Sequence, residues 1–226
     1  MHTIEPIAYI HTDFKEKFGI PRQSGLVSEL TAKIVFVPKY RNPDSLREIE
    51  SFSHLWLLFD FSKAHRDEWS PTVRPPRLGG NKRMGVFATR SPFRPNPIGL
   101  SCVKIEGIEK TEEGAVIRVS GADLVDGTPI YDIKPYLPFT DSRPEATGGF
   151  AEEKLEYSLE VCFPQELLEK IAPDKREGVM EILSQDPRPA YNDDPERVFG
   201  FEFGTQEIKF KVSQGILTVL SVQDIK

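Results

Sequence analysis

The chain has 226 residues, of which 38% are hydrophobic and 28% are charged, enough for a sizeable core in one large domain or in a large and a small one. Its first residues lack the basic segment and apolar run of a signal peptide, and no stretch reaches the length of a membrane span. We therefore expect a cytoplasmic protein. The formal net charge of −6 argues against a nucleic-acid partner unless the charge is unevenly divided.

The charge is in fact unevenly divided along the chain. Residues 63–94 hold eight basic and two acidic side chains, whereas the rest of the chain holds 21 basic and 33 acidic ones. A basic patch on an otherwise acidic protein is typical of local phosphate contact. The alternative is a basic loop that pairs with acidic neighbours. We favour phosphate binding.

Strand-like runs dominate the first part of the chain. Residues 5–11, 29–37, 54–61, 99–108 and 115–120 are rich in β-branched and aromatic side chains. One helix is expected over residues 43–52, where Asn42 can cap and Pro43 suits the first turn. The chain lacks both a strand–helix alternation and a G-x-G-x-x-G turn after a strand, which argues against a Rossmann-type nucleotide domain. Short strands with proline-rich connections predict a closed or strongly curved antiparallel barrel.

Composition changes near residues 144–153, which are typical of a surface loop or linker. Hydrophobic periodicity then predicts a strand at 155–163, a helix begun by Pro164, a second helix at 174–184 and strands at 198–203, 208–212 and 216–222. The predicted fold class is α+β, mainly β. We expect a β-barrel-like domain over residues 1–147 and a small α+β domain over residues 148–226.

The run of residues 84–101 places Arg90, Arg94 and Asn96 among prolines at positions 92, 95 and 97. Proline disfavours the helical region for the residue before it, so this segment is expected to be an extended loop of low entropy. Guanidinium groups on such a loop lose little entropy when they bind an anion. The alternative is a rigid connection between two strands whose arginines are only solvated.

Residues 20–23, 74–81, 123–129 and 133–139 also combine polar side chains with a rigid backbone. In the third of these, Asp123 and Asp126 precede Gly127 and can present carboxylates to ribose hydroxyls or to an amino group. An Asx-type turn is the alternative.

Aromatic side chains accompany the charges in two further segments. Tyr136 and Phe139 can stack on a base while Lys134 meets a phosphate, or both rings can belong to the core. Arg188 lies between two prolines beside Tyr191, which also suits a turn that stops a helix. The four histidines lack metal-ligand spacing, so no metal is expected. The residues alone indicate a β-rich binder of an anionic, base-containing ligand.

In this order, the motifs resemble the TrmO family of S-adenosylmethionine-dependent tRNA methyltransferases, which methylate N6 of N6-threonylcarbamoyladenosine beside the anticodon. The resemblance covers nearly the whole chain and rests on residues 74–81, 84–101, 123–129, 132–139 and 185–191. It implies a β-barrel methyltransferase domain, a small C-terminal domain and a homodimer. It also implies S-adenosyl-L-methionine as cofactor and, as substrate, a tRNA modified at position 37, expected to be a threonine tRNA.

The same resemblance implies site residues. The cofactor is expected against Pro21, Arg22, Gln23, Ser62, Lys63, Arg90, Leu100, Asp123, Leu124, Val125 and Asp126. At positions 62 and 63 the chain departs from the family pattern, which has His-Gln there. Substrate contacts are expected from Arg94, Asn96, Lys134, Tyr136 and Arg188.

The catalytic residue is left unassigned, and Asp126, Tyr131 and Asp132 are candidates, on their chemistry, to accept the N6 proton. Two rival functions fit the same residues. One is methylation of another modified nucleoside or a metabolite on the same fold, and the other is a noncatalytic RNA-binding module. Binding of the cofactor separates the module from the enzymes, and dependence on the existing modification separates the two enzymes.

Overall fold

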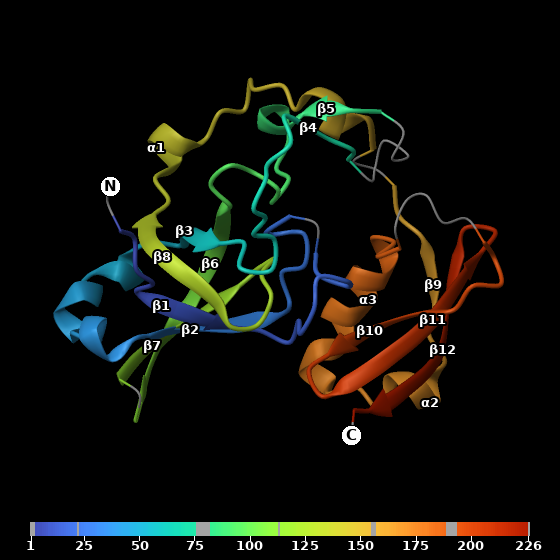
Figure 1. Cartoon of the computed structure of the whole chain (residues 1–226). Helices are drawn as coiled ribbons and strands as arrows, with labels where there is room; N and C mark the ends of the chain where they lie inside the picture. The colour runs from blue at the N-terminus through green and yellow to red at the C-terminus, as the bar shows by residue number, and fades with distance from the viewer. Residues whose placement is uncertain are drawn as a thin grey trace.

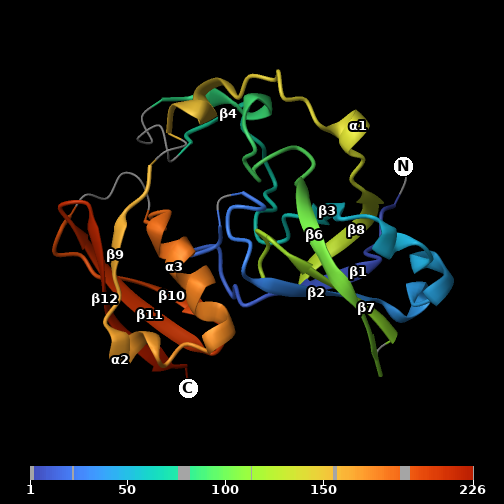
Figure 2. The same cartoon turned by 180° about the vertical axis from the view of Figure 1, so that it is seen from behind.

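The computed structural model describes residues 3–21, 23–75, 82–112, 114–154, 157–188 and 194–225. Figure 1 shows a β-rich body made mostly by the first half of the chain, beside a smaller body in which helices cover a sheet from the last third. Figure 2 shows the same two bodies from behind. The predicted fold class, mainly β with a small α+β C-terminal part, is confirmed.

Six strands form the larger body: β1 (Ala8–His11), β2 (Thr31–Phe36), β3 (His54–Asp60), β6 (Ile98–Thr111), β7 (Gly114–Ser120) and β8 (Thr128–Pro135). They pair antiparallel in the order β1-β2-β7-β6-β3-β8, and β8 pairs in turn with β1. The sheet therefore closes on itself, as the short strands and proline-rich connections predicted. Each of the five predicted strands overlaps an observed one.

Alternating side chains fill the inside of this closed sheet. In β3, for example, Leu55, Leu57 and Phe59 are buried while their neighbours are partly exposed. Ile34 and Ile130 from other strands belong to the same hydrophobic cluster. Because six short strands leave an interior just large enough for their own side chains, a ligand has to bind at an end of the barrel rather than inside it.

The expected helix over residues 43–52 is wrong. The structure has two separate 3₁₀ turns there, η2 (Pro43–Leu46) and η3 (Ile49–Ser51), after a third, η1 (Pro38–Tyr40). Asn42 does cap, because its side chain accepts from the Asp44 backbone N–H at 3.0 Å. Glu48, however, has a φ of +65°, a left-handed conformation that interrupts a right-handed helix.

Shorter elements lie outside the six strands of the barrel. They are β4 (Thr72–Val73), β5 (Met84–Gly85), η5 (Val86–Ala88), α1 (Pro138–Asp141) and η6 (Gly149–Lys154). β4 and β5 pair antiparallel and form a small sheet of their own, which Figure 1 shows above the barrel. This sheet fixes the start of the proline-rich loop that leads into β6.

The C-terminal body follows the predicted order of elements. It comprises β9 (Glu160–Cys162), α2 (Gln165–Leu168), η7 (Pro173–Lys175), α3 (Arg176–Ser184), β10 (Phe199–Phe203), β11 (Gln206–Ser213) and β12 (Ile216–Asp224). Its sheet has the order β10-β11-β12-β9, with β9 parallel to β12. The expected strand at 155–163 is shorter than predicted, and the helix expected after Pro164 spans Gln165–Leu168, whereas the second helix and the last three strands match closely.

Residues between β1 and β2 join the two bodies. Phe14, Val27 and Leu30 are buried in the same hydrophobic cluster as Phe201 and Phe210 of the C-terminal sheet. The core around that sheet therefore includes side chains from the first 30 residues of the chain. This packing fixes the position of the loop after β1, which forms one wall of the site described below.

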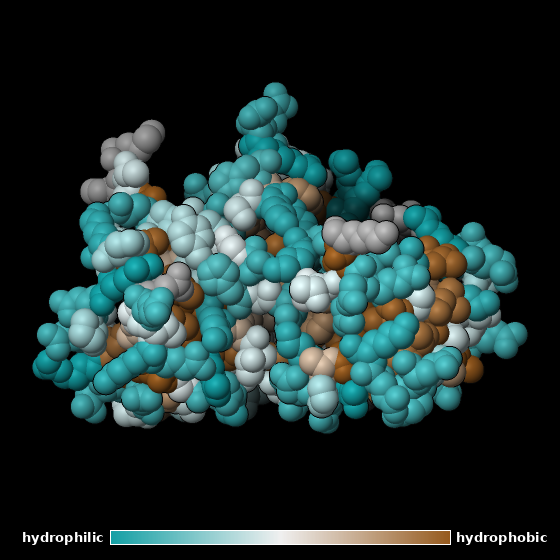
Figure 3. Space-filling model, turned by 90° about the horizontal axis from the view of Figure 1, so that it is seen from below, coloured by the Kyte–Doolittle hydropathy of each residue, from teal (hydrophilic) through white to brown (hydrophobic). Residues whose placement is uncertain are grey.

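Figure 3 shows the molecule from below, with hydrophilic and hydrophobic residues interspersed over most of this face. The larger hydrophobic area in this view lies over the C-terminal body. Across the described ranges, none of the helices combines the length and the apolar character that crossing a membrane requires.

Candidate functional site

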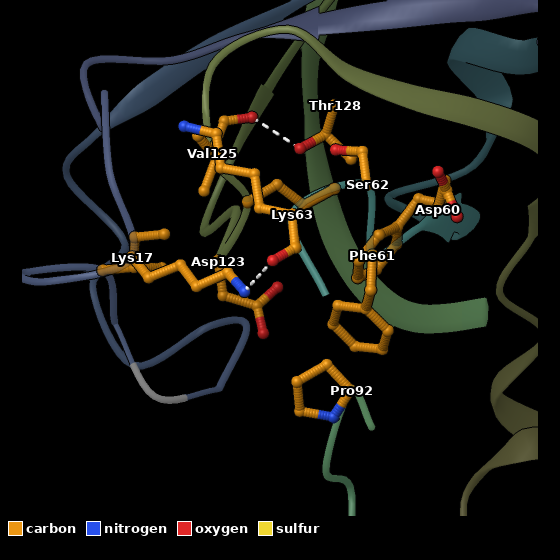
Figure 4. A pocket seen from close by; sticks show the side chains of 12 residues that line it. Lys17, Asp60, Phe61, Ser62, Lys63, Pro92, Asp123, Val125 and Thr128 are labelled. Atoms are coloured by element: carbon orange, nitrogen blue, oxygen red, sulfur yellow. Dashed lines mark hydrogen bonds between the residues drawn. The ribbon is translucent and has the colours of Figure 1, made fainter. Parts of the chain in front are cut away.

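A small cavity of about 130 Å³ lies at one end of the barrel, where four segments meet (Figure 4). Residues 17–20 follow β1, residues 59–63 end β3 and continue beyond it, Pro92 comes from the proline-rich loop, and residues 123–128 lead into β8. The cavity brings together five residues that the sequence analysis assigned to the cofactor, which are Ser62, Lys63, Asp123, Leu124 and Val125.

Asp123 provides a half-buried carboxylate in this cavity. The Ser101 hydroxyl donates a hydrogen bond of 2.5 Å to its Oδ1. Burial raises the pKa of Asp123, and this effect outweighs the opposing hydrogen bond from Ser101 and the positive charge of Arg90. In Figure 4 the carboxylate points to the space between Lys17 and Pro92. The cavity therefore offers a partly desolvated acceptor for hydroxyl or ammonium donors of a ligand.

Cations surround the mouth of the cavity. Lys17 Nζ donates to the Lys63 carbonyl at 2.5 Å and Lys63 Nζ donates to the Lys15 carbonyl at 2.8 Å, which ties two loops together. The Arg66 guanidinium carbon lies 3.6 Å from the centroid of the Phe93 ring, and Lys17 Nζ lies 5.8 Å from it. Burial and the charges of Lys63 and Arg66 lower the pKa of Lys17. A bound anion would relieve the repulsion among these three cations.

A larger trough of about 1,940 Å³ lies next to the cavity and shares Lys17, Ile20 and Pro92 with it. Ligand pockets usually have about 300–1,000 Å³, so the small cavity alone can hold only part of a cofactor or nucleotide. The predicted site residues that line the trough are Pro21, Gln23, Arg90, Arg94 and Arg188. Its walls come from both bodies of the molecule.

Hydrogen bonds from its own arginines hold the proline-rich loop in place. Arg90 donates to the Gln23 side chain across the trough, so this loop and the segment after β1 are held together. Arg94 Nη1 donates to the carbonyls of Thr89, at 2.8 Å, and Val86, at 3.3 Å. These bonds use one guanidinium nitrogen of Arg94, and arginine carries five N–H donors in all. Arg94 thus both shapes the loop and lines the trough.

Among the described residues, five predicted site residues lie outside the linings of both the cavity and the trough, namely Leu100, Asn96, Asp126, Lys134 and Tyr136. Asp126 pairs with Lys15 at 2.8 Å and accepts from the Thr12 N–H at 3.1 Å. Although burial raises the pKa of Asp126, these partners outweigh it and lower the pKa. Leu100 is 55% exposed, opposite Leu58 in the β3–β6 ladder, and Asn96 is exposed. Arg22 is outside the described residues.

Lys134 and Tyr136 lie far from the cavity. Thr128, which lines the cavity, starts β8, and Tyr136 follows the end of that strand, about 25 Å further at the usual rise per residue. Lys134 pairs with Asp132 at 2.8 Å. The Tyr136 ring packs against Trp56, with centroids 5.7 Å apart. The structure therefore does not bring these two predicted substrate contacts together with the others.

Arg188 lies at the C-terminal wall of the trough with its charge already paired. Its Nε and Nη2 donate to the two carboxylate oxygens of Asp186 at 2.8 and 2.9 Å, and the Tyr157 hydroxyl donates to the same carboxylate at 2.9 Å. The Arg188 side chain is only 11% exposed. Burial raises the pKa of Asp186, but the bonds from Arg188 and Tyr157 outweigh it and lower the pKa.

We therefore expect Arg188→Gln to act through stability. Removing one partner of a buried ion pair leaves the other charge unpaired, which costs about 3 kcal/mol of unfolding free energy. Because the folded pKa of Asp186 is lowered, its contribution is present above the unfolded value of about 3.9 and is lost as pH falls through the folded value. Urea unfolding of wild type and variant should differ at pH 7 and converge below about pH 4. A variant of wild-type stability that has lost affinity for an anionic ligand would instead make Arg188 a ligand contact.

Several side chains at the site were not predicted from the sequence. Asp60 lines the cavity, and His65 Nε2 lies 2.8 Å from its Oδ1. Burial, together with the charge and hydrogen bond of Asp60, raises the pKa of Tyr131, so this candidate proton acceptor keeps its proton. Lys17 carried no motif that would have singled it out, whereas Arg66 belongs to the basic stretch of residues 63–94 that predicted phosphate contact. Only the pairing of β3 with β8 and the folding of the loop after β1 place these residues here.

Comparison with known proteins gives consistent matches over both bodies. A family model described as the tRNA-methyltransferase O N-terminal domain matches residues 9–142, and one described as the TrmO C-terminal domain matches residues 156–225. A tRNA (adenine(37)-N6)-methyltransferase of Escherichia coli (strain K12) is 47% identical over 193 residues, which cover 83% of this chain and 82% of the relative.

Two further similar proteins extend the comparison. A Pyrococcus abyssi protein named as a probable S-adenosyl-L-methionine-binding protein is 37% identical over 183 residues, covering 75% of this chain and 93% of the relative. The crystal structure of TrmO from P. aeruginosa superimposes with a TM-score of 0.80 at 33% identity and covers 99% of this chain and 97% of that one.

Proposed function

The chain belongs to the TrmO family and is a tRNA adenosine N6-methyltransferase, and from this premise we propose that it methylates N6 of N6-threonylcarbamoyladenosine at position 37 of a tRNA, with S-adenosyl-L-methionine as the methyl donor. One observation carries the proposal. The half-buried carboxylate of Asp123 meets Lys17 and Lys63 in a cavity next to an open basic trough. The carboxylate can bind the ammonium or hydroxyl groups of S-adenosyl-L-methionine, and the cations can bind its carboxylate and the phosphates of the tRNA.

The residues of the cavity fit S-adenosyl-L-methionine chemically. This molecule carries ribose hydroxyls, an ammonium, a carboxylate and an apolar adenine face, and it supplies a methyl group on a positively charged sulfur. Asp123 would accept from hydroxyl or ammonium donors, and Lys17 or Lys63 would hold the carboxylate. Ile20 and Leu124 offer apolar surface for adenine. The small volume of the cavity requires that part of the molecule lies in the trough.

Catalysis in this proposal comes mainly from positioning. Methyl transfer is a displacement in line with the breaking bond, so the acceptor nitrogen has to be held against the methyl group in a water-poor site. The threonylcarbamoyl group adds a carboxylate to the substrate, and the tRNA backbone adds phosphates. Arg66, Arg90 and Arg94 line the trough and provide donors for these anions. An anticodon-loop base can be splayed out to reach them at small unstacking cost.

The direct test is transfer of labelled methyl to tRNA that carries or lacks the threonylcarbamoyl modification, followed by mass analysis of the nucleosides. The proposal predicts methyl only on the modified adenosine, with threonine tRNA as a substrate. Methyl transfer to both tRNAs would contradict the requirement for the modification. Transfer to neither, with cofactor bound, would indicate the rival enzyme on a different acceptor, and no cofactor binding would indicate an RNA-binding module.

We also propose that the chain works as a homodimer. Ile98 and Leu100 lie two residues apart on β6, on the same outer face, and are 41% and 55% exposed. A second copy would remove this apolar surface from water. Sedimentation should give a dimer for the wild-type chain and a shift toward monomer for Leu100→Glu. A wild-type monomer at micromolar concentration would contradict the proposal.

A further inference from the structure

Two aromatic rings stack on each other at the wall of the trough, in a region that no site assignment above covers. Trp69 precedes β4, and Phe87 lies in η5 directly after β5. The ring centroids are 6.1 Å apart with an interplanar angle of 30°. The pairing of Thr72 with Gly85 and of Val73 with Met84 in the β4–β5 sheet holds the two segments side by side.

Both rings are open to water although they are large and apolar. Trp69 is 52% exposed and Phe87 is 70% exposed, and both line the trough. A scattered exposed aromatic is common on protein surfaces, but two stacked ones that line the same trough form a contiguous flat surface. Such a surface favours a planar partner, because ring faces attract other ring faces in offset stacks.

Positive charge surrounds this flat surface. The Arg94 guanidinium carbon lies 5.6 Å from the centroid of the Phe87 ring. The trough is also lined by the basic residues Lys17, Arg66, Arg74, Arg83, Arg90 and Arg188. Asp67 and Glu68 are the acidic residues among its lining positions. Aromatic rings within a basic groove are the arrangement by which proteins hold single-stranded nucleic acid.

We propose that Trp69 and Phe87 form a stacking platform for an unpaired anticodon-loop base next to the base that is methylated. The inference deepens the proposed function and rests on it. The trough and the cavity share Lys17, Ile20 and Pro92 in their linings. An RNA strand bound in the trough would therefore place one of its bases next to the cavity. Stacking of a neighbouring base would hold the loop open while the modified base enters.

The chain offers a matched control for the platform. Phe139 in α1 is 86% exposed, and it lies outside the linings of both the cavity and the trough. The segment of Phe139 also suggested base stacking, but this ring follows the end of β8 that is far from the cavity, so Phe139→Ala removes a ring of the same type as Phe87 without touching the trough. It should leave RNA binding unchanged, whereas Trp69→Ala and Phe87→Ala should weaken it.

The binding experiment uses an anticodon stem-loop RNA as the probe and tryptophan fluorescence as the readout. The chain has two tryptophans, so a Trp56→Phe background reports on Trp69 alone. A base stacked on the indole should quench its fluorescence in a saturable titration. Trp69→Ala and Phe87→Ala, measured by fluorescence anisotropy of labelled RNA, should raise the Kd about ten-fold or more. Trp69→Phe should restore most of the affinity.

The possible results distinguish a failure of the stacking platform from a failure of the proposed function. RNA that binds the wild-type chain with an affinity unchanged by Trp69→Ala and Phe87→Ala would overturn the platform and leave the proposed function standing. A wild-type chain that does not bind the RNA would overturn both. If Trp69→Ala leaves RNA affinity unchanged and converts a dimer to a monomer in sedimentation, a second copy covers the rings and the platform is overturned. Unchanged binding of S-adenosyl-L-methionine in each variant controls for folding of the site.

Discussion

Asp123→Asn is expected to lower kcat/KM for methyl transfer by about 10- to 100-fold, the usual worth of a hydrogen bond to a charged group. The substitution keeps the shape of the side chain and removes its negative charge from the cavity. Because burial raises the pKa of Asp123, the charged carboxylate lowers the free energy of unfolding relative to a neutral side chain. The neutral amide should therefore not lower the unfolding free energy, which separates the loss of activity from a loss of stability.

The pH dependence of cofactor binding provides a second readout for the same variant. The affinity of the wild-type chain for S-adenosyl-L-methionine should fall as pH decreases through the pKa of Asp123, which lies above the ordinary aspartate value. Asp123→Asn should lack this dependence. Ser101→Ala, which removes the hydrogen bond to Oδ1 that favours the charged form, should move the dependence to higher pH. An Asn variant with wild-type kinetics and affinity would remove Asp123 from the binding site.

Gly19→Ala is expected to be the most damaging small substitution in the loop after β1. Gly19 has a φ of +88°, and an added Cβ would lie 2.4 Å from Cδ2 of Phe201, which is 1% exposed. A left-handed conformation for alanine and a clash with a packed core ring together cost about 2–5 kcal/mol. Because Lys17 and Ile20 on either side line the cavity, cofactor affinity should fall as well. Urea unfolding and calorimetric titration measure the two effects.

Gly25→Ala is the matched control for this prediction. Gly25 has a similar φ of +76°, but nothing lies within 4 Å of an added Cβ. It should therefore show only the backbone part of the cost, about 1–2 kcal/mol. Equal destabilisation by the two substitutions would mean that Gly19 does not lock the loop onto Phe201, and that the C-terminal sheet does not position this wall of the cavity.

Much of the fold follows from local sequence patterns, because strand propensity and alternation directly reflect burial on one face of a sheet. β3 is an example, since each buried side chain in it alternates with a more exposed one. The helix expected over residues 43–52 failed because periodicity and the Asn42 cap do not reveal the left-handed residue Glu48.

The site was less predictable than the fold, since it depends on contacts between distant segments. Asp123 and its two successors carried a local signal and do line the cavity. Lys134 and Tyr136 carried a similar signal but lie at the end of β8 that is far from the cavity, because a polar motif does not reveal which end of a strand faces the ligand. The pairing of Arg188 with Asp186 depends on a turn with a φ of +52° at Asp186 that composition cannot show.

The most direct measurement is a crystal structure of the chain with S-adenosylhomocysteine and an anticodon stem-loop that carries the modified adenosine. The account predicts the nucleoside in the cavity, with a ribose hydroxyl or the amino group within hydrogen-bond distance of Asp123, and the RNA strand in the basic trough. S-adenosylhomocysteine bound elsewhere, with Asp123 free of contact to it, would contradict the assignment of this cavity.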